Sequence, residues 1–235
     1  MTAIKNSTVL VTGGSRGIGK HLVEQLYQRG AAKVYATARD PRSVTHPDAV
    51  PLALEATDPQ SALLLAEQAK DVTILINNAG ISTGADYLTS DLAEIHRDFE
   101  TNFFGPLHVT RALVPVLEAN GGGHILNVLS VVSWIAGGGS YSASKSAFWS
   151  QTNSLRVALL PRGISVTGLH VGYVDTDLTV GIDAPKITPE AVAAKALDGI
   201  ESGAYEVLVD ERSQRVKAAL SGPLENLYAS LPRLG

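Results

Sequence analysis

The stretch Thr8 to Gly19, TVLVTGGSRGIG, decides the fold of this chain. Residues 8–12 form a short apolar run of the kind found in the buried strands of parallel sheets. The glycines that follow, spaced Gly13-x-x-x-Gly17-x-Gly19, allow a tight turn and let backbone N–H groups approach a phosphate at a helix N-terminus. A strand, a glycine turn and a helix in this order predict the start of a dinucleotide-binding βαβ unit.

The same alternation of strands and helices continues along the chain. Leu22, Val23 and Leu26 lie on one face of the helix expected after the turn, and Gly30 ends it. Further strands are expected at residues 33–37, 50–54, 72–76, 124–129, 164–169 and 205–209, and helices at 59–70, about 91–118, 141–160 and 189–200. Pro106 and Pro115 are positions where the longest helix could bend. No linker or repeat interrupts the pattern, which predicts a single α/β domain over residues 1–235. Its sheet should be a doubly wound, Rossmann-like parallel sheet with helices on both faces.

Composition excludes several classes of protein. The 235 residues are 45% hydrophobic and 18% charged, with a net charge of -4 and no basic run, which disfavours a nucleic-acid or anionic-membrane partner. The absence of cysteine excludes disulfides and thiol nucleophiles, and the six scattered histidines show no metal-ligand spacing. No run of about 18 apolar residues suggests a membrane span, and no apolar leader precedes the first glycine loop. We therefore expect a soluble, cytoplasmic protein without a metal site.

Tyr141 and Lys145 form the pair most suggestive of chemistry. Four residues apart on an expected helix, they lie on one face about one turn from each other. A lysine ammonium close to a phenol favours the phenolate, so we expect Lys145 to lower the pKa of Tyr141 toward the range of an acid/base catalyst. Such pairs also occur on many surface helices, so the spacing alone does not decide the function.

Several further motifs, in a fixed order along the chain, favour a functional role for Tyr141 and Lys145. The chain carries TGGSRGIG at residues 12–19, NNAG at 77–80, Asn102, Ser130 and Tyr141-x-x-x-Lys145. In order and rough spacing these motifs resemble the short-chain dehydrogenase/reductase family, and its compact single-domain branch in particular. The similarity extends from Thr8 to about Val209.

The resemblance implies a catalytic set of Asn102, Ser130, Tyr141 and Lys145. Tyr141 would be the acid/base, Ser130 would fix the substrate oxygen, and Lys145 would lower the tyrosine pKa and bind the nicotinamide ribose. Asn102 would help hold a water that links the lysine to solvent. Ser130 precedes Tyr141 by eleven residues, where the family often has two more, so Ser133 is the alternative serine.

The resemblance also implies a nicotinamide cofactor site. Its residues would be Gly13, Ser15, Arg16, Gly17, Ile18, Gly19, Arg39, Asn78, Ala79, Gly80, Tyr141, Lys145, Val174 and Thr176. Two departures lie nearby: Val171 stands where the family commonly has proline, and Glu55 where an aspartate is usual.

Charge favours one of the two nicotinamide cofactors. The second expected strand ends in Ala38 and Arg39, where an acidic residue would bind a ribose 2′-OH and repel a 2′-phosphate. Arg16 and Arg39 could together hold a phosphate with forked hydrogen bonds. Asp40 is the contrary signal, but we expect it to point to solvent. NADP(H) is therefore favoured over NAD(H).

These inferences predict an NADP(H)-dependent oxidoreductase that interconverts a ketone or aldehyde and an alcohol. The expected pocket walls contain no arginine or lysine, which indicates a neutral, rather apolar substrate. Those wall residues are Ile81, Val131, Val132, Trp134, Ile135, Tyr173, Leu178, Val180 and Ile182. Two alternatives remain: a non-catalytic NADP(H)-binding sensor or scaffold, and a cofactor-independent fold relative such as a dehalogenase.

The resemblance further suggests a homodimer or homotetramer. The helices around Asn102 and Tyr141 would pack against their copies. They carry the apolar residues Phe103, Leu107, Ala147, Phe148 and Trp149, which could instead face the sheet.

Overall fold

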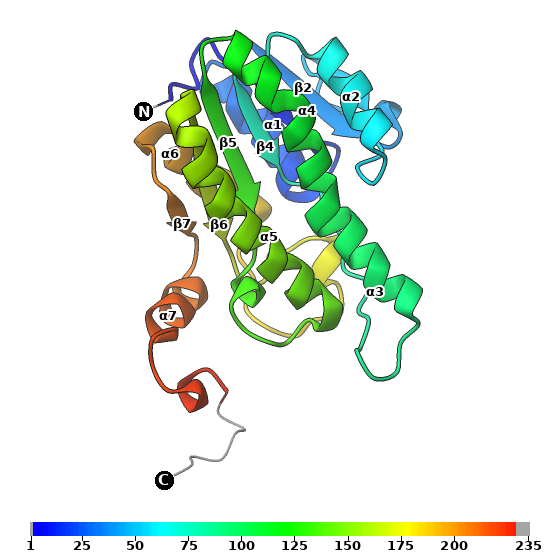
Figure 1. Cartoon of the computed structure of the whole chain (residues 1–235), viewed down its shortest axis with the longest axis vertical. Coiled ribbons are helices and arrows are strands. Elements are labelled where there is room, and N and C mark those ends of the chain that lie inside the picture. The colour runs from blue at the N-terminus through cyan, green and yellow to red at the C-terminus, as the bar shows by residue number, and fades with distance from the viewer. Residues whose placement is uncertain (1, 229–235) are drawn as a thin grey trace.

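A seven-stranded parallel sheet forms the centre of the protein, whose computed structural model describes residues 2–228. The strands are β1 (Thr8–Val11), β2 (Lys33–Ala38), β3 (Val50–Ala53), β4 (Ile74–Asn77), β5 (Gly123–Val128), β6 (Ile164–His170) and β7 (Glu206–Leu208). Their order is β3-β2-β1-β4-β5-β6-β7, and every neighbouring pair is parallel (Figure 1). This is the doubly wound Rossmann-like sheet that the sequence predicts.

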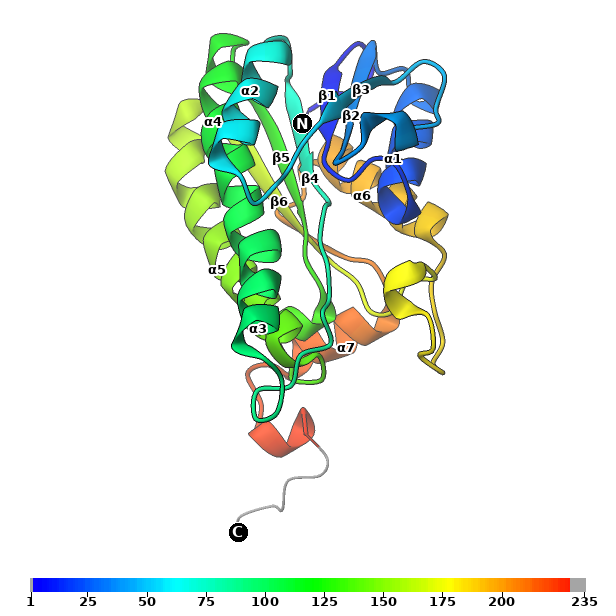
Figure 2. The same cartoon turned by 90° about the vertical axis from the view of Figure 1, so that its right-hand side faces the viewer.

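Helices cover both faces of the sheet (Figure 2). One face carries α1 (Gly17–Gln28) and α6 (Pro189–Ser202); the other carries α2 (Pro59–Gln68), α4 (Gly105–Ala119) and α5 (Gly139–Leu159). The two faces explain the uninterrupted apolar run in β1, because successive side chains point to opposite sides of a strand. Val9 and Val11 pack into the core beneath α1 and α6, whereas Leu10 packs into the core beneath α2 and α4.

The remaining elements are shorter. α3 (Leu92–Phe99) and α7 (Glu211–Ala219) lie toward the end of the molecule to which the strands point (Figure 1). Short 3₁₀ turns occur at Pro41–Ser43, Val131–Ser133, Leu160–Arg162, Asp177–Thr179 and Leu224–Asn226.

The long helix expected over residues 91–118 is present but contains a wider turn. α3 passes through a π-helical segment, Glu100–Phe104, directly into α4. Pro106 lacks an N–H, and its ring crowds the carbonyl of the residue four positions earlier, Asn102. The helix therefore widens at Asn102, whose side chain is fully buried. Pro115 lies inside α4 without ending it.

The helix α7 is absent from the sequence-based expectations. Asp210 precedes it and accepts a hydrogen bond from the backbone N–H of Ser213 (2.7 Å), which satisfies one of the free donors of the first turn. The same carboxylate accepts from the N–H of Gly172 (2.6 Å), in the segment that follows β6. Asp210 thereby attaches α7 to the end of the sheet at which ligands bind in folds of this class.

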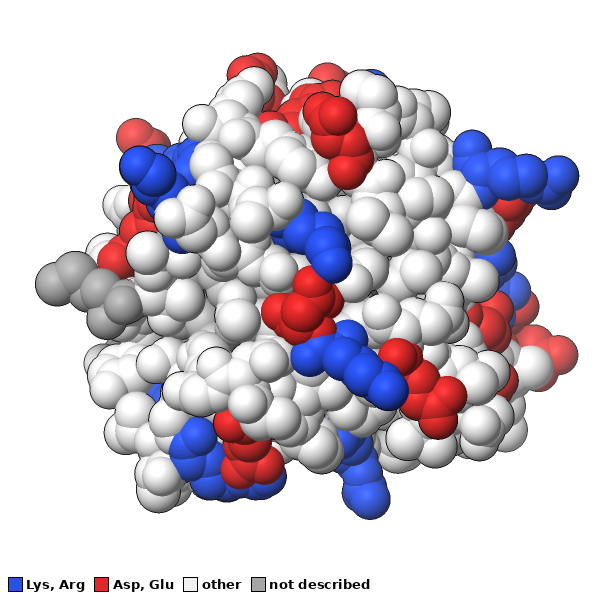
Figure 3. Space-filling model, turned by 90° about the horizontal axis from the view of Figure 1, so that it is seen from above, with Lys and Arg blue, Asp and Glu red and all other residues white. Residues whose placement is uncertain are grey.

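The surface agrees with the charge balance of the sequence. On the face beyond the N-terminal ends of the strands, acidic and basic side chains are interspersed rather than gathered into one patch (Figure 3). Within residues 2–228, no helix is long and apolar enough to cross a membrane. The same part of the chain contains no cluster of three His, Cys, Asp or Glu side chains that could hold a metal ion.

Candidate active site

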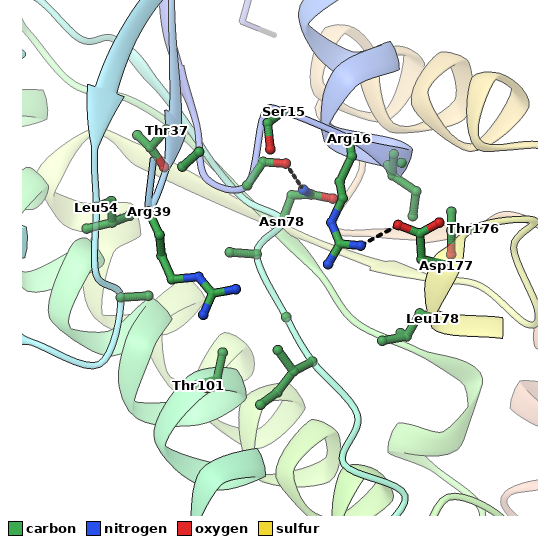
Figure 4. A pocket seen from close by; sticks show the side chains of 18 of the residues that line it. Ser15, Arg16, Thr37, Arg39, Leu54, Asn78, Thr101, Thr176, Asp177 and Leu178 are labelled. Carbon is green, nitrogen blue, oxygen red and sulfur yellow. Dashed lines mark hydrogen bonds and ion pairs between the residues drawn. The ribbon is translucent and has the colours of Figure 1, made fainter. Parts of the chain in front are cut away.

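A groove of about 930 Å³ runs along the carboxyl ends of β1, β2 and β4 (Figure 4). Ten of the residues predicted to bind the cofactor line it: Gly13, Ser15, Arg16, Gly17, Ile18, Arg39, Asn78, Ala79, Gly80 and Thr176. They come from the glycine turn, the ends of two strands and the segment after β6, so the fold gathers residues that are far apart in the sequence.

The glycines of the turn have different functions. Gly13 has a φ of +66°, a conformation that side chains disfavour, and lines the groove. Gly19, predicted as a cofactor residue, does not line the groove. A Cβ at Gly19 would lie 2.0 Å from the carbonyl oxygen of Gly13, so glycine is required there for α1 to pack against the turn.

The wall of the groove offers free polar groups to a ligand. Arg16, the N-cap residue of α1, makes no side-chain cap hydrogen bond, and no acidic residue lies in the first helical turn. The backbone N–H groups of that turn can therefore bind an anion, where the helix dipole favours negative charge. The hydroxyl of Thr37 is buried and has no hydrogen-bond partner among the described residues. The turn fits the pyrophosphate of a dinucleotide, and Thr37 offers a further polar contact.

Hydrogen bonds fix the NNAG segment beside the turn. The hydroxyl of Thr12 accepts from the backbone N–H of Asn78 and of Ala79, each at 3.0 Å. The side-chain amide of Asn78 donates to the carbonyl of Thr12 at 2.9 Å. Asn77, one residue earlier, donates to Asn127 on β5 at 2.9 Å. The segment thus ties three neighbouring strands together at the floor of the groove.

The two arginines predicted to hold a phosphate lie differently from each other. Arg39 is exposed and extends into the groove, whereas Arg16 turns toward Asp177, with which it forms an exposed ion pair (Figure 4). Arg16 is thus paired with an acid and does not extend into the groove beside Arg39 as the predicted phosphate clamp requires, although exposed pairs of this kind are weak and exchange readily. Asp40 binds Arg42 at 2.9 Å, and this hydrogen bonding lowers the pKa of Asp40. Its carboxylate is therefore engaged outside the groove.

A second cavity, of about 420 Å³, adjoins the groove and contains the predicted reactive groups. Ser130, Tyr141 and Lys145 all line it, as does Val174. Five residues line both spaces and connect them: Ile18, Asn78, Gly80, Thr176 and Leu178. A ligand in the groove would therefore have direct access to Tyr141. We call this second space the catalytic pocket.

The two candidate serines have different surroundings. Ser130 follows β5 directly and lines the catalytic pocket together with Tyr141, whose pKa its hydroxyl lowers. Ser133 is buried and does not line the pocket; its hydroxyl accepts from the backbone N–H of Ser130 at 3.3 Å. Ser133 thus supports the turn that presents Ser130, and the pocket geometry favours Ser130.

The pKa of Tyr141 differs from the sequence-based expectation. Burial, the largest cause, raises it, the hydroxyl of Ser130 lowers it, and the negative charge of Asp98 raises it, with a net value of about 12. The ammonium of Lys145 lies 5.8 Å from the centre of the tyrosine ring and donates to the carbonyl of Val128 at 3.0 Å. Burial lowers the pKa of Lys145 to about 8. The prediction of a lowered tyrosine pKa is therefore wrong in direction, because burial of the phenol is the largest cause of the shift and raises the pKa.

Asn102 lies beside Lys145 but outside both cavities. Its side-chain amide donates to the carbonyl of Ile81 (2.9 Å) and to the hydroxyl of Ser144 (3.0 Å), and its oxygen accepts from the N–H of Ile81 (2.9 Å). A Cβ at Gly80 would lie 3.1 Å from the Asn102 oxygen and 3.5 Å from the Lys145 nitrogen. Asn102 therefore holds the floor of the pocket against α5, close to the lysine.

Asp98 is a buried residue that sequence reasoning missed. Its carboxylate accepts from the hydroxyls of Ser140 (2.5 Å) and Thr83 (2.9 Å), and from the N–H of Thr83 (3.0 Å). It thus fixes the turn of α5 that leads into Tyr141, and its charge reaches the phenol. It belongs to none of the motifs, so no sequence signal singled it out.

His170 is a second buried residue near the pocket that the sequence analysis did not single out. It is one of the six histidines that show no metal-ligand spacing. It is fully buried at the end of β6, and its Nδ1 lies 3.1 Å from the carbonyl oxygen of Ser130. The ring of Trp134 stacks on it, with ring centres 3.7 Å apart. Burial lowers the pKa of His170 to about 3, so the imidazole is neutral.

The pocket walls differ from the expected list. Val131, Val132, Tyr173, Leu178 and Ile182 line the catalytic pocket, but Trp134, Ile135 and Val180 do not, and Ile81 lines the cofactor groove. Arg212 of α7 also lines the pocket, which contradicts the expectation of walls without a cationic arginine or lysine. Arg212 lies beyond the part of the chain that the resemblance covers, so no motif pointed to it.

Comparisons with known proteins agree with this geometry. The family model of the short chain dehydrogenases matches residues 7–186. A ketoacyl reductase, HetN, of Nostoc sp. is 32% identical over 234 residues, which cover 90% of this chain and 81% of the relative. A 1-deoxy-11-beta-hydroxypentalenate dehydrogenase of Streptomyces avermitilis is 32% identical over 200 residues, covering 78% and 74% of the two chains.

A solved structure extends the agreement to three dimensions. The crystal structure of a short chain dehydrogenase from Burkholderia cenocepacia in complex with NADP superposes with a TM-score of 0.93. Its sequence is 34% identical, and the match covers 99% of this chain and 100% of that one. On the family match, the fold and these relatives, the chain belongs to the short-chain dehydrogenase/reductase family of oxidoreductases.

Proposed function

We propose that the protein is an NADP(H)-dependent oxidoreductase that interconverts a ketone or aldehyde and an alcohol, with residues 1–235 as one catalytic domain. One observation carries the proposal: Ser130, Tyr141 and Lys145 line one pocket, which adjoins the groove lined by the glycine turn. The ketoacyl reductase and the pentalenate dehydrogenase are named for the same class of reaction.

Each residue of the pocket has a distinct task in this proposal. The nicotinamide, when bound, supplies or accepts the hydride. Tyr141 donates the phenolic proton to the carbonyl oxygen as negative charge develops there, and its phenolate accepts the proton of an alcohol in the reverse direction. Ser130 donates a hydrogen bond to the same substrate oxygen and holds it near the phenol. Lys145, as an ammonium, stabilises the phenolate electrostatically.

The residues around the lysine extend this proposal. We assign the ribose hydroxyls of the cofactor to Lys145 and the carboxamide end to Val174 and Thr176. Asn102 positions the segment between the lysine and the groove. It also supports a water path from Lys145 to solvent.

Two charges support NADP(H) over NAD(H). Arg39 extends into the groove at the end of β2 with no carboxylate within salt-bridge distance among the described residues. Asp40, the nearest acid in the sequence, is engaged by Arg42. A guanidinium in this place attracts a 2′-phosphate dianion. The NADP complex of the relative from Burkholderia cenocepacia is consistent with this choice.

A panel of ketones and aldehydes tests the proposal. Purified protein is mixed with NADPH or NADH and each carbonyl, and the absorbance of the reduced cofactor is followed. We expect substrate-dependent oxidation of NADPH, with NADH the poorer donor. Binding of NADPH without turnover of any carbonyl or alcohol would favour the sensor or scaffold alternative. Lack of binding to either cofactor would favour the cofactor-independent alternative.

We also propose that the protein is a homodimer or homotetramer. The residues expected at the interface are only partly available, because Phe148 is buried in its own subunit and Trp149 packs against Trp134. The outer surface of α5 retains an exposed apolar residue, Val157, which is 77% exposed. A solution mass near 24.7 kDa by light scattering would contradict an oligomer.

A further inference from the structure

Arg212 lines the catalytic pocket but not the cofactor groove. It projects from the first turn of α7 and lines the same space as Ser130 and Tyr141. The proposed function places the cofactor phosphates in the groove, which Arg212 does not line, so Arg212 is not placed to bind them. Its charge is available to the substrate.

The guanidinium of Arg212 has no anionic partner within residues 2–228. No carboxylate of that part of the chain lies within 4.0 Å, and no hydrogen bond engages it. It lies over the ring of Tyr173, 4.7 Å from the ring centre, in a half-buried position. Lys217, on the same helix, is bound instead to Glu206 at 2.7 Å. Arg212 therefore keeps its fork of N–H donors free next to the pocket.

The position of Arg212 is fixed by its neighbours. Asp210 and Ser213 form a reciprocal cap around it, and Asp210 binds the N–H of Gly172 at 2.6 Å. A Cβ at Gly172 would lie 3.5 Å from the Cδ of Arg212, so the arginine stem runs along this backbone. A charge held in this way binds a ligand at a smaller cost in side-chain entropy than a free surface arginine does.

We propose that Arg212 binds a carboxylate on the substrate, so that the protein acts on a keto acid or hydroxy acid with an apolar spacer between its two functional groups. This inference rests on the proposed function. The carbonyl lies at Tyr141 and Ser130, the spacer runs along the apolar wall, and the carboxylate meets the guanidinium. The wall residues in contact with the spacer would be Val131, Val132 and Val174.

Asp86 also lines the pocket, and its negative charge limits which anionic group of a substrate can bind there. Its carboxylate accepts from the backbone N–H of Leu88 (2.9 Å) and the hydroxyl of Thr89 (3.2 Å), and this hydrogen bonding lowers its pKa. Asp86 thus remains negatively charged and disfavours a dianion in the same space. A monoanionic carboxylate matches the single charge of Arg212.

Matched pairs of substrates test the proposal. Aliphatic methyl ketones that carry a carboxylate at the far end, at increasing separations, are compared with their methyl esters. We expect kcat/KM for the best acid to exceed that of its ester by roughly tenfold or more, as a hydrogen-bonded charge pair provides. Arg212→Leu should lower kcat/KM for the acid to about that of its ester, and Arg212→Lys should restore part of the preference.

Arg215→Leu is the control, because Arg215 lies on the same helix, is exposed and lines neither cavity. It should keep the preference for the acid. Equal rates for acid and ester in the unaltered protein, or a preference that survives Arg212→Leu, would overturn the assignment of Arg212 and leave the proposed function intact.

A binding measurement separates the two proposals. Unbranched alkanoates, which cannot be reduced, are titrated calorimetrically into the protein with NADP⁺ present. Binding that Arg212→Leu abolishes and Arg215→Leu retains supports the carboxylate site even if no ketone is turned over. Binding that is absent or equal in both variants overturns it.

Discussion

Replacing Lys145 by methionine tests how much the burial of the lysine ammonium lowers the free energy of unfolding. The side chain of Lys145 is 4% exposed, and burial lowers its pKa from 10.5 to about 8. A lysine with a folded-state pKa below its unfolded value destabilises the folded protein at every pH at which it must carry a proton. Methionine has a similar length and no charge, so Lys145→Met removes this cost.

The magnitude follows from the two pKa values. Below pH 8 the lysine is charged in both the folded and the unfolded state. Keeping the buried lysine charged then costs the folded state the free energy that corresponds to the difference between the two pKa values, about 3 kcal/mol. Between pH 8 and 10.5 the unfolded chain binds more protons than the folded one, so stability rises with pH. Between pH 7 and pH 10 the free energy of unfolding of the unaltered protein should therefore rise by about 2 to 3 kcal/mol relative to Lys145→Met.

Urea unfolding at several pH values, followed by circular dichroism without cofactor, measures this difference. The lost hydrogen bond to the carbonyl of Val128 lowers the stability of the variant by an amount that does not depend on pH over this range, so it cancels. Lys195→Met is the control, because Lys195 is exposed on α6 and remains in water in both states. A difference between protein and variant that stays constant from pH 7 to pH 10 would refute the argument that burial governs Lys145.

Three further predictions concern catalysis and cofactor choice. Tyr141→Phe should reduce turnover roughly a hundredfold to ten-thousandfold while NADPH binding, measured by fluorescence titration, stays nearly unchanged, because only the proton donor is lost. Arg39→Asp should lower the NADPH/NADH ratio of kcat/KM at least roughly tenfold, and an unchanged ratio would contradict the phosphate contact. Asp98→Asn removes a charge that raises the pKa of Tyr141, so the pH profile of alcohol oxidation should move to lower pH; a shift to higher pH would contradict this assignment.

The sheet was predictable because its central strands are buried on both faces and appear in the sequence as apolar runs followed by turns. Leu10 and its neighbours on β1 show why, since alternate side chains fill two different cores. The π-helical turn at Asn102 was only partly predictable. Pro106 indicated a disturbance of the helix, but its effect is a wider turn rather than a break.

The electrostatics of the pocket could not be predicted from spacing. A lysine four residues from a tyrosine lowers the tyrosine pKa only where its charge outweighs the cost of burying the phenolate. In the folded protein, both groups are enclosed, and burial shifts the two pKa values in opposite directions, with that of Tyr141 raised and that of Lys145 lowered. Below pH 8 Lys145 still carries its charge, whereas the phenol of Tyr141 is neutral, so the buried pair holds one proton donor beside one cation.

The substrate end of the pocket was the least predictable part, because its position depends on tertiary contacts of a polar helix. The sequence of α7, ERSQRVKAA, has no apolar stripe, and Ser213 is its one buried residue. The helix is held by Asp210 at Gly172 and by Lys217, which lies 5.0 Å from the ring centre of Trp134. The catalytic motifs end before this helix begins. From these motifs alone, Lys145 is the one cation expected in the pocket. Arg212 enters only through the fold, so the residue that should select the substrate is one that no catalytic motif contains.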